Sequence, residues 1–232
     1  ANPRHHFKSE RNAVKILRAS HLLPWFVQRF PGEFLFLVRH PVPTALSRAR
    51  NGWVAPIESF VGQHEWFSGL SEAQRALVKG EENVEGVKGV ERASGGALFR
   101  RHILVWCLEH AGILTGDDKF LSALPQNFTT LHYETLVSEA PAVLPLLAKK
   151  WRLPREQEFY DRYSRPSRSS RYSGDAAKSA IGKGDTQGML DRWRDVVSAE
   201  DMDFTRQALE IFEIPHYTVE ETMPVYKSSS AL

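Results

Sequence analysis

The amino-acid sequence predicts an α/β protein with a mainly parallel sheet flanked by helices. Short apolar runs with the length of strands alternate with longer segments in which apolar residues recur every three or four positions. Hydrophobic residues make up 42% of the 232 positions and charged residues 25%, which is the balance of an ordinary globular protein. We therefore expect one domain over residues 1–232, long enough to bury a sizeable core.

Three apolar runs have the length of strands. Residues 34–38, FLFLV, are five consecutive apolar residues, a pattern typical of a strand buried on both faces. Residues 13–17 form a shorter run, and residues 127–133 alternate with β-branched and aromatic side chains. Because helical patterns separate these runs, parallel pairing is expected.

The predicted helices follow the strands in order. The first begins near residue 20 and should bury one face, formed by Leu22, Leu23, Phe26, Val27 and Phe30. The others are a helix that begins near Pro43, two short helices within 56–78, a long helix over 97–114, a helix from 133 to 151 interrupted early by Pro141, and a last helix over 199–213.

Three segments have the composition of loops or tails. Residues 1–11 are expected to form an N-terminal tail. Residues 79–96 are acidic and rich in glycine, which predicts an exposed loop. Residues 164–188 are basic and rich in serine and glycine, which predicts a flap with few core contacts.

Composition excludes several classes of function. A net charge of +2 without a basic arm argues against nucleic-acid binding. The single cysteine, Cys107, excludes an internal disulfide and predicts a reducing, cytoplasmic setting. No apolar run has the length of a membrane span and no signal peptide is visible, although the chain starts without methionine and can be a fragment. Oligomeric state is not predicted.

Arg39 and Ser47 are the first candidates for a binding site. Arg39 ends the apolar run 34–38, and the carboxyl ends of strands are where ligands bind in open α/β sheets. Ser47 lies eight residues later, about one turn into the expected helix. A guanidinium, a hydroxyl and the backbone N–H groups of a helix N-terminus can together hold one phosphate. The alternative is an arginine paired with a nearby carboxylate and a serine that faces water.

The string FLVRHPVPTALSR resembles the 3′-phosphate-binding segment of the sulfotransferase family, whose members use 3′-phosphoadenosine 5′-phosphosulfate (PAPS). In that family an arginine ends a buried strand, a proline follows two residues later, and a serine follows eight residues later. The resemblance implies that Arg39 and Ser47 bind the ribose 3′-phosphate of PAPS. It also implies the architecture of P-loop nucleoside triphosphate hydrolases.

Further matches follow in the family's order over residues 12–212. Lys15, 24 residues before Arg39, resembles a lysine that precedes a Leu-Leu-Pro helix. TTLHYETL resembles the family segment whose tyrosine approaches adenine, which implies that role for Tyr133. KGDTQGMLDRWR resembles the segment that closes over the 3′-phosphate. Its candidates are Lys183, Gly184 and Arg194.

One departure from the family concerns its amino-terminal part. Members begin with a strand and a loop of the type S-G-T-T-W, which binds the 5′-phosphosulfate through backbone N–H groups. This sequence has no such loop, so it resembles a sulfotransferase domain that is incomplete at its N-terminus.

Sulfuryl transfer needs in-line geometry, a cation near the developing charge and a base for the acceptor hydroxyl, but no metal. Lys15 is the candidate cation, with an exposed strand-end lysine as the alternative. Cytosolic members carry a histidine two residues after that lysine, where this chain has Leu17. His21 is the candidate base, with a helix cap or core residue as the alternative.

The expected function is therefore transfer of a sulfuryl group from PAPS to a hydroxyl of a small molecule, glycan or lipid. The alternative is a non-catalytic relative that has lost the phosphosulfate loop. A nucleotide kinase is disfavoured because no Walker motif is present. No metal site is predicted, since His102 and His110 are eight residues apart on one expected helix, too far for a metal pair.

Overall fold

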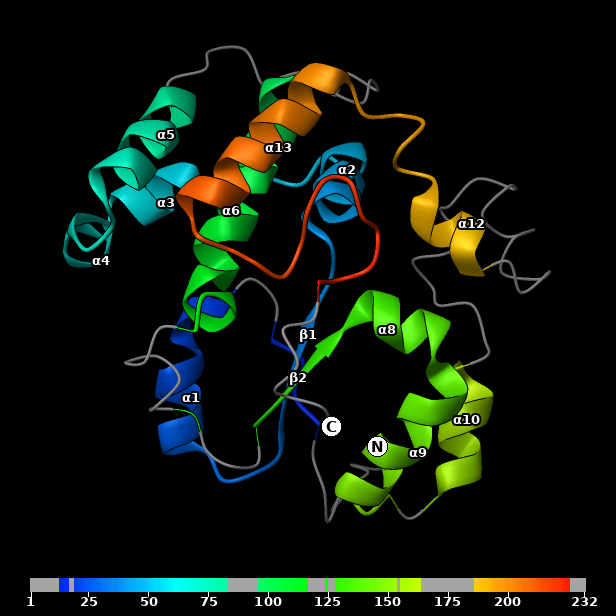
Figure 1. Ribbon diagram of the computed structural model, residues 1–232. Helices are drawn as coiled ribbons and strands as arrows, with labels where there is room; N and C mark the ends of the chain where they lie inside the picture. The colour runs from blue at the N-terminus through cyan, green and yellow to red at the C-terminus, as the bar shows by residue number, and fades with distance from the viewer. Residues whose placement is uncertain are drawn as a thin grey trace, which may run out of the picture.

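The computed structural model describes residues 13–16, 19–82, 96–116, 124, 128–153, 155–163 and 186–225. These residues form a mixed α/β structure that is mostly helical (Figure 1). The α/β class is thus confirmed, whereas the P-loop architecture remains a prediction. None of the described helices is both long and apolar enough to cross a membrane.

The described sheet contains two strands, β1 (Phe34–Val38) and β2 (Phe128–His132). They pair in parallel, with Phe34 opposite Phe128 and Val38 opposite His132. The expected parallel pairing is therefore confirmed for these two strands. Residues 13–16 have no regular secondary structure and are exposed, so the strand predicted at 13–17 does not form there.

Only one face of β1 is buried, contrary to the expectation of a strand buried on both faces. Phe36 and Val38 are 7% and 0% exposed and point into the core, whereas Leu35 and Leu37 are 39% and 47% exposed. Successive side chains of a strand point to opposite faces, so the helical core covers one face and the other is open among the described residues.

The core is built around α6 (Ala97–Leu114), which has the boundaries predicted from its apolar pattern. Helices pack against it on several sides, and most of its residues are buried, including some polar ones. The helices in contact with α6 are α2 (Pro41–Arg50), α3 (Ile57–Val61), α5 (Glu72–Glu82) and α13 (Ala199–Ile211). The short 3-10 helix η1 (Ser20–Leu22) also contacts α6. Figure 1 shows α13 lying along α6.

Polar side chains on α6 are buried but have partners, as burial requires. Glu109, whose side chain is 1% exposed, forms a 3.0 Å ion pair with Arg48 of α2. The guanidinium of Arg101 donates to the backbone carbonyls of residues 55, 81 and 82 and pairs with Glu58. His110 Nδ1 donates to the carbonyl of Trp106 over 2.7 Å. These bonds connect α6 to α2, α3 and α5.

A second group of helices follows β2: α8 (Tyr133–Ser138), α9 (Ala140–Lys150) and α10 (Glu156–Tyr163). Leu131 of β2 and Val143 and Leu147 of α9 form a small cluster of their own. The predicted interruption near Pro141 is confirmed, because α9 begins anew with this proline in its first turn, where its missing N–H costs nothing.

Several predicted elements differ from the observed ones. Helix α1 (Leu23–Arg29) has no buried residue, and Leu22 and Phe30 are 44% and 53% exposed, so its expected apolar face is only partly covered. Three helices, α3, α4 (His64–Ser68) and α5, replace the two expected in that region, and α5 runs into the start of the loop predicted at 79–96. The two helices α10 and α12 (Thr186–Asp191) were not predicted. Residues 1–11, 83–95 and 164–185 lie outside the described residues.

We expect Arg48→Ala to lower the free energy of unfolding by about 3–5 kcal/mol, because it removes the Arg48 cation from its 3.0 Å pair with the buried Glu109 carboxylate. Urea unfolding followed by circular dichroism measures this loss. Arg206→Ala is the matched control, since Arg206 pairs with Asp203 and Glu220 at the surface and its removal should have little effect. Equal losses in the two variants would contradict the importance of the buried pair.

Candidate functional site

The candidate site lies where the two strands end. Val38 and His132 are opposite each other in the register, so Arg39 and Tyr133, which follow them, emerge at the same edge of the sheet. The Arg39 guanidinium carbon lies over the Tyr133 ring, 4.8 Å from its centroid. Such a cation–π contact favours a flat orientation of the guanidinium on the ring. The structure thus brings together two of the predicted site residues.

The Arg39 guanidinium has no hydrogen bond and no ion pair with any residue that the structure describes. Its Nε is buried and lacks an acceptor. A buried donor without an acceptor is costly, and a guanidinium offers a planar fork of donors that matches a phosphate or carboxylate. The arrangement can therefore bind an anion, and the alternative of a structural ion pair is not found in the described part of the chain.

The peptide unit that joins Arg39 to His40 is held by two buried side chains. The Trp106 indole N–H, from the centre of α6, donates to the Arg39 carbonyl over 3.0 Å. The His40 backbone N–H donates to Glu134 Oε1 of α8 over 2.9 Å. These two bonds tie the end of β1 to the helical core and to the start of α8.

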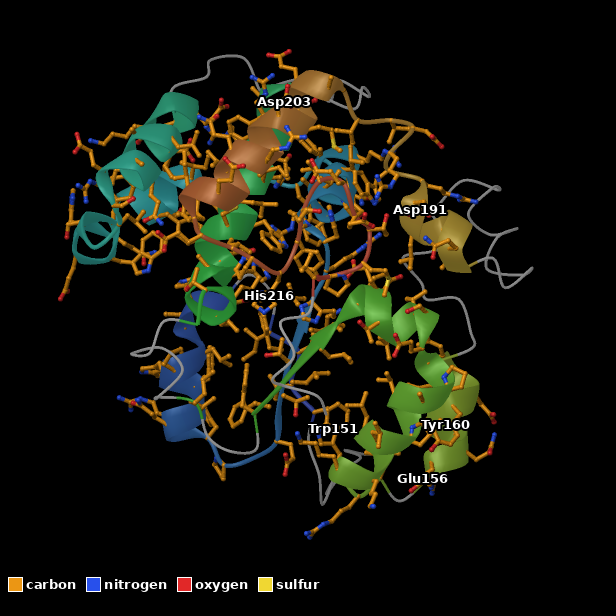
Figure 2. The ribbon with its side chains drawn as sticks, in the orientation of Figure 1. Trp151, Glu156, Tyr160, Asp191, Asp203 and His216 are labelled. Carbon is orange, nitrogen blue, oxygen red and sulfur yellow. The ribbon has the colours of Figure 1, made fainter. Side chains whose placement is uncertain are left out.

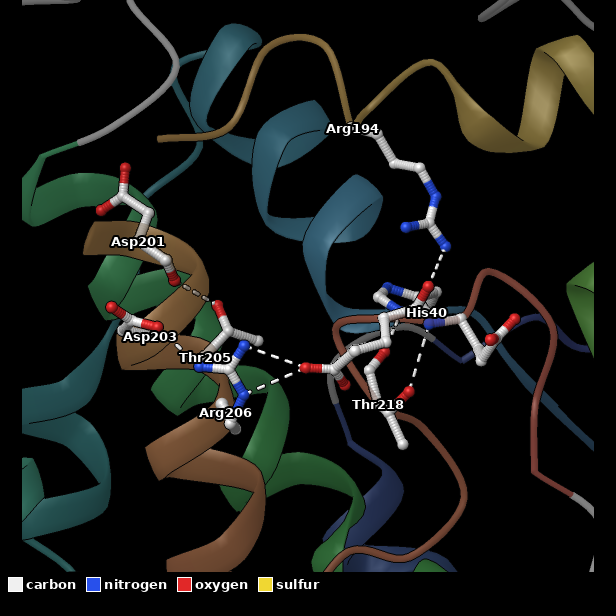
Figure 3. A network of polar contacts seen from close by, with 9 residues as sticks. His40, Arg194, Asp201, Asp203, Thr205, Arg206 and Thr218 are labelled. Atoms are coloured by element: carbon white, nitrogen blue, oxygen red, sulfur yellow. Dashed lines mark hydrogen bonds and ion pairs between the residues drawn. The ribbon is translucent and has the colours of Figure 1, made fainter. Parts of the chain in front are cut away.

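His40 caps helix α2 and connects it to the C-terminal segment. Its Nδ1 accepts from the Val42 N–H over 3.2 Å, so the proton is on Nε2, which donates to the Thr218 carbonyl over 2.9 Å (Figure 3). The ring also stacks on Trp193 with centroids 4.8 Å apart. Burial lowers the pKa of His40 to about 4, with smaller contributions from the nearby Arg194 and Arg39 charges. His40 is therefore neutral at pH 7.

Glu134 joins the strand end to the C-terminal segment. Its carboxylate is buried, with Oε1 accepting from the His40 N–H and Oε2 from the Tyr217 hydroxyl, both over 2.9 Å. Burial raises the pKa of Glu134, while these hydrogen bonds and the positive charge of Arg39 act in the opposite direction. Each oxygen of this carboxylate accepts one of these hydrogen bonds, and no ion pair joins it to Arg39 among the described residues.

The N-terminus of α2 offers no free backbone N–H, contrary to the prediction that it would help to bind an anion. The helix begins at Pro41 rather than near Pro43, and neither proline has an N–H. The Val42 N–H donates to the His40 ring, and the Thr44 N–H donates to the His40 carbonyl. An anion at this edge of the sheet would therefore depend on side chains.

Ser47 is exposed on α2, and no hydrogen bond joins it to Arg39 among the described residues. The earlier start of α2 places it roughly 9 Å along the helix axis from Pro41, at 1.5 Å per residue. Thr44 lies three residues before it on the same helix face, and its hydroxyl oxygen is buried without a partner. Thr44 is a candidate that the sequence analysis did not identify, although its spacing from Ser47 is a signal.

The surroundings of the two catalytic candidates agree with the alternatives given for them. Lys15 is exposed, lies outside any helix or strand, and has no hydrogen bond or ion pair in the described part of the chain. His21 is half-buried in η1, with its ring edge-on to Phe60 of α3 at 5.5 Å. Burial lowers the pKa of His21. This packing supports the alternative interpretation of His21 as a core residue.

Arg194 lies close to the site but is engaged by the C-terminal segment. Its guanidinium donates to the Glu220 carbonyl and, over 3.3 Å, to the Thr222 hydroxyl, and it stacks over Trp193 at 4.8 Å. Lys183 and Gly184 lie outside the described residues. No group of three or more possible metal ligands is found in the segments that the structure describes.

Two histidines extend the site toward the C-terminus. His132, the last residue of β2, stacks on His216 with ring centroids 5.6 Å apart, and Figure 2 places His216 between α6 and the strands. Burial, followed by the proximity of His216, lowers the pKa of His132 to about 4. Sequence reasoning missed His216 and Tyr217 because no local pattern connects the C-terminal segment to the strand ends.

Comparisons with known proteins add no assignment. No protein-family model matches the chain, and neither a curated protein nor a solved structure shows significant similarity to it.

Three buried histidines predict that the protein loses stability in mild acid. The pKa values of His40, His110 and His132 are about 4 in the folded protein, and burial is the main cause in each case. An unfolded chain binds these protons near pH 6.5, so the free energy of unfolding falls as the pH drops from 6.5 to 4. Each histidine contributes at most about 3 kcal/mol, and the raised pKa of Glu134 offsets a part.

Urea unfolding at pH values between 7.5 and 4.5 measures this dependence. His110→Gln should flatten the profile, since one buried titrating group is removed. The exposed His64 serves as the control, and His64→Gln should leave the profile unchanged. A free energy of unfolding that is constant or rises toward pH 4.5 would show that these histidines do not control acid stability.

Proposed function

We propose that this chain is a PAPS-dependent sulfotransferase domain in which Arg39 binds the 3′-phosphate of the nucleotide. The observation that carries this proposal is the Arg39 guanidinium, which lies at the carboxyl edge of the sheet without any anionic partner among the described residues. The order of the sequence motifs supplies the ligand class. Ser47 and Thr44, on one face of α2, are candidates for further contacts to the same phosphate.

Tyr133 has a role in this proposal that differs from the one implied by the resemblance. Its ring supports the Arg39 guanidinium at 4.8 Å, which orients the donors of the fork. A contact between Tyr133 and adenine remains a prediction. In either role the aromatic ring is needed, whereas the hydroxyl is dispensable for the contact to Arg39.

Lys183 and Gly184 complete the proposed nucleotide site on the basis of the resemblance alone. The acceptor is proposed to carry a hydroxyl on a small molecule, glycan or lipid. Lys15 is retained as the proposed cation for sulfuryl transfer.

A second candidate function is nucleotide binding without catalysis. The observation in its favour is the position of His21, whose ring packs edge-on against Phe60 of α3 at 5.5 Å. A base for the acceptor hydroxyl has therefore not been identified among the described residues. Turnover separates the two functions: release of ³⁵S-labelled product from labelled PAPS and a panel of hydroxyl acceptors supports the transferase, and binding without turnover supports the second candidate.

We expect Arg39→Ala to weaken binding of adenosine 3′,5′-bisphosphate by about 1.5–3 kcal/mol, which is the contribution of a charge-assisted hydrogen bond. Isothermal titration calorimetry measures the Kd, and adenosine 5′-monophosphate, which lacks the 3′-phosphate, should bind equally to both proteins. Arg50→Ala removes an exposed arginine from the last turn of the same helix and is the matched control. An unchanged affinity in Arg39→Ala would refute the proposed site.

We expect Tyr133→Phe to keep the affinity for the bisphosphate, because the ring under Arg39 is preserved. Tyr133→Ala should lower this affinity, because the guanidinium loses its support. The same titration measures both. A loss in Tyr133→Phe as large as in Tyr133→Ala would assign the contribution to the hydroxyl and contradict the supporting role of the ring.

A further inference from the structure

We infer that Tyr217 is a positioning residue for Arg39: its hydroxyl holds the Glu134 carboxylate, which in turn fixes the backbone turn that presents the guanidinium. This inference rests on the proposed function, since it concerns the same anion site. It assigns to the C-terminal segment, residues 214–225, a part in binding that no sequence motif indicates.

The chain of contacts has two hydrogen bonds. The Tyr217 hydroxyl donates to Glu134 Oε2 over 2.9 Å, and Glu134 Oε1 accepts from the His40 N–H over the same distance. The His40 N–H belongs to the peptide unit directly after Arg39. Glu134 and Tyr217 are 1% and 2% exposed, so water does not compete for these bonds.

Packing makes the position of the Tyr217 ring independent of its hydroxyl. The ring lies edge-on to His40, His132 and Trp106, at centroid distances of 5.1, 5.6 and 5.9 Å. Tyr217→Phe should therefore keep the ring in place and remove one hydrogen bond from the carboxylate. Glu134 Oε2 is then buried without the Tyr217 donor. This loss favours reorientation of the Glu134 carboxylate, which weakens the bond from the His40 N–H to Oε1.

The C-terminal segment is held over the site by contacts of its own. The Thr218 carbonyl accepts from His40 Nε2, a bond between residues 178 positions apart. The Glu220 carbonyl accepts from Arg194, and the Glu220 carboxylate accepts from Arg206 over 2.9 Å. Figure 3 draws these contacts as dashed lines from the labelled Arg194 and Arg206. The anion site at the end of β1 is therefore complete only when this segment is docked.

The experiment compares two nucleotides in two proteins. Calorimetric titration of Tyr217→Phe should give a Kd for adenosine 3′,5′-bisphosphate that is raised roughly tenfold, as expected for the indirect loss of one charged contact, and an unchanged Kd for adenosine 5′-monophosphate. Tyr160→Phe, which removes an exposed hydroxyl on α10, should change neither Kd. A general loss of folding in Tyr217→Phe would weaken both nucleotides alike, and this result would overturn a positioning role.

A second measurement uses the unsubstituted protein and does not depend on the folding of a variant. Coupling between two sites is reciprocal, so a ligand that needs the docked segment must also stabilise it. The bisphosphate, but not the monophosphate, should slow amide hydrogen exchange in residues 214–222. If the chain prefers the bisphosphate but shows neither this protection nor a weaker affinity in Tyr217→Phe, the positioning role is wrong while the proposed function stands. If the chain does not prefer the bisphosphate, the proposed function fails and this inference with it.

Discussion

The burial of α6 is the constraint on which the rest of the described structure depends. An 18-residue helix with neighbours on several sides must place its polar side chains where partners exist, because an unsatisfied buried group costs about 1–3 kcal/mol. Glu109 meets this requirement through Arg48 of α2. Trp106 meets it through the Arg39 carbonyl, so the same helix that organises the core also fixes the end of β1. The hydrogen bond from Trp106 to the Arg39 carbonyl is thus one of the contacts that connect the core to the candidate site.

The electrostatics of the strand end follow from how Glu134 is used. A carboxylate close to a guanidinium would ordinarily neutralise it, and an anion site would then be lost. Here both oxygens of Glu134 accept from the His40 N–H and the Tyr217 hydroxyl, while the Arg39 guanidinium lies on the Tyr133 ring. The negative charge remains near enough to favour the cation but is not bonded to it, so the donors of Arg39 are left for a ligand.

The sequence was sufficient for elements with a strong local pattern. Helix α6 was predicted with its exact observed bounds, and the pairing of β1 with β2 followed from the alternation of strands and helices. It was insufficient where the outcome depends on distant residues. Five apolar residues in β1 do not reveal that Leu35 and Leu37 face outward, since this depends on what covers the sheet.

The candidate site shows the same division. Arg39 was identified from its place after a strand, and Tyr133 from the resemblance of TTLHYETL to a sulfotransferase segment. The structure brings these two residues together. The lack of a free backbone N–H at the N-terminus of α2 depends on the rotamer of the His40 side chain, which no local pattern specifies.

The distance along the chain between the bonded groups also bears on the kinetics of folding. His40 is 94 positions from Glu134 and 178 from Thr218. Forming these two contacts closes long segments of chain, which costs conformational entropy. Hydrogen bonds within helices α2, α6 and α13 are local, so we expect them to form before the contacts that hold the edge of the sheet with Arg39.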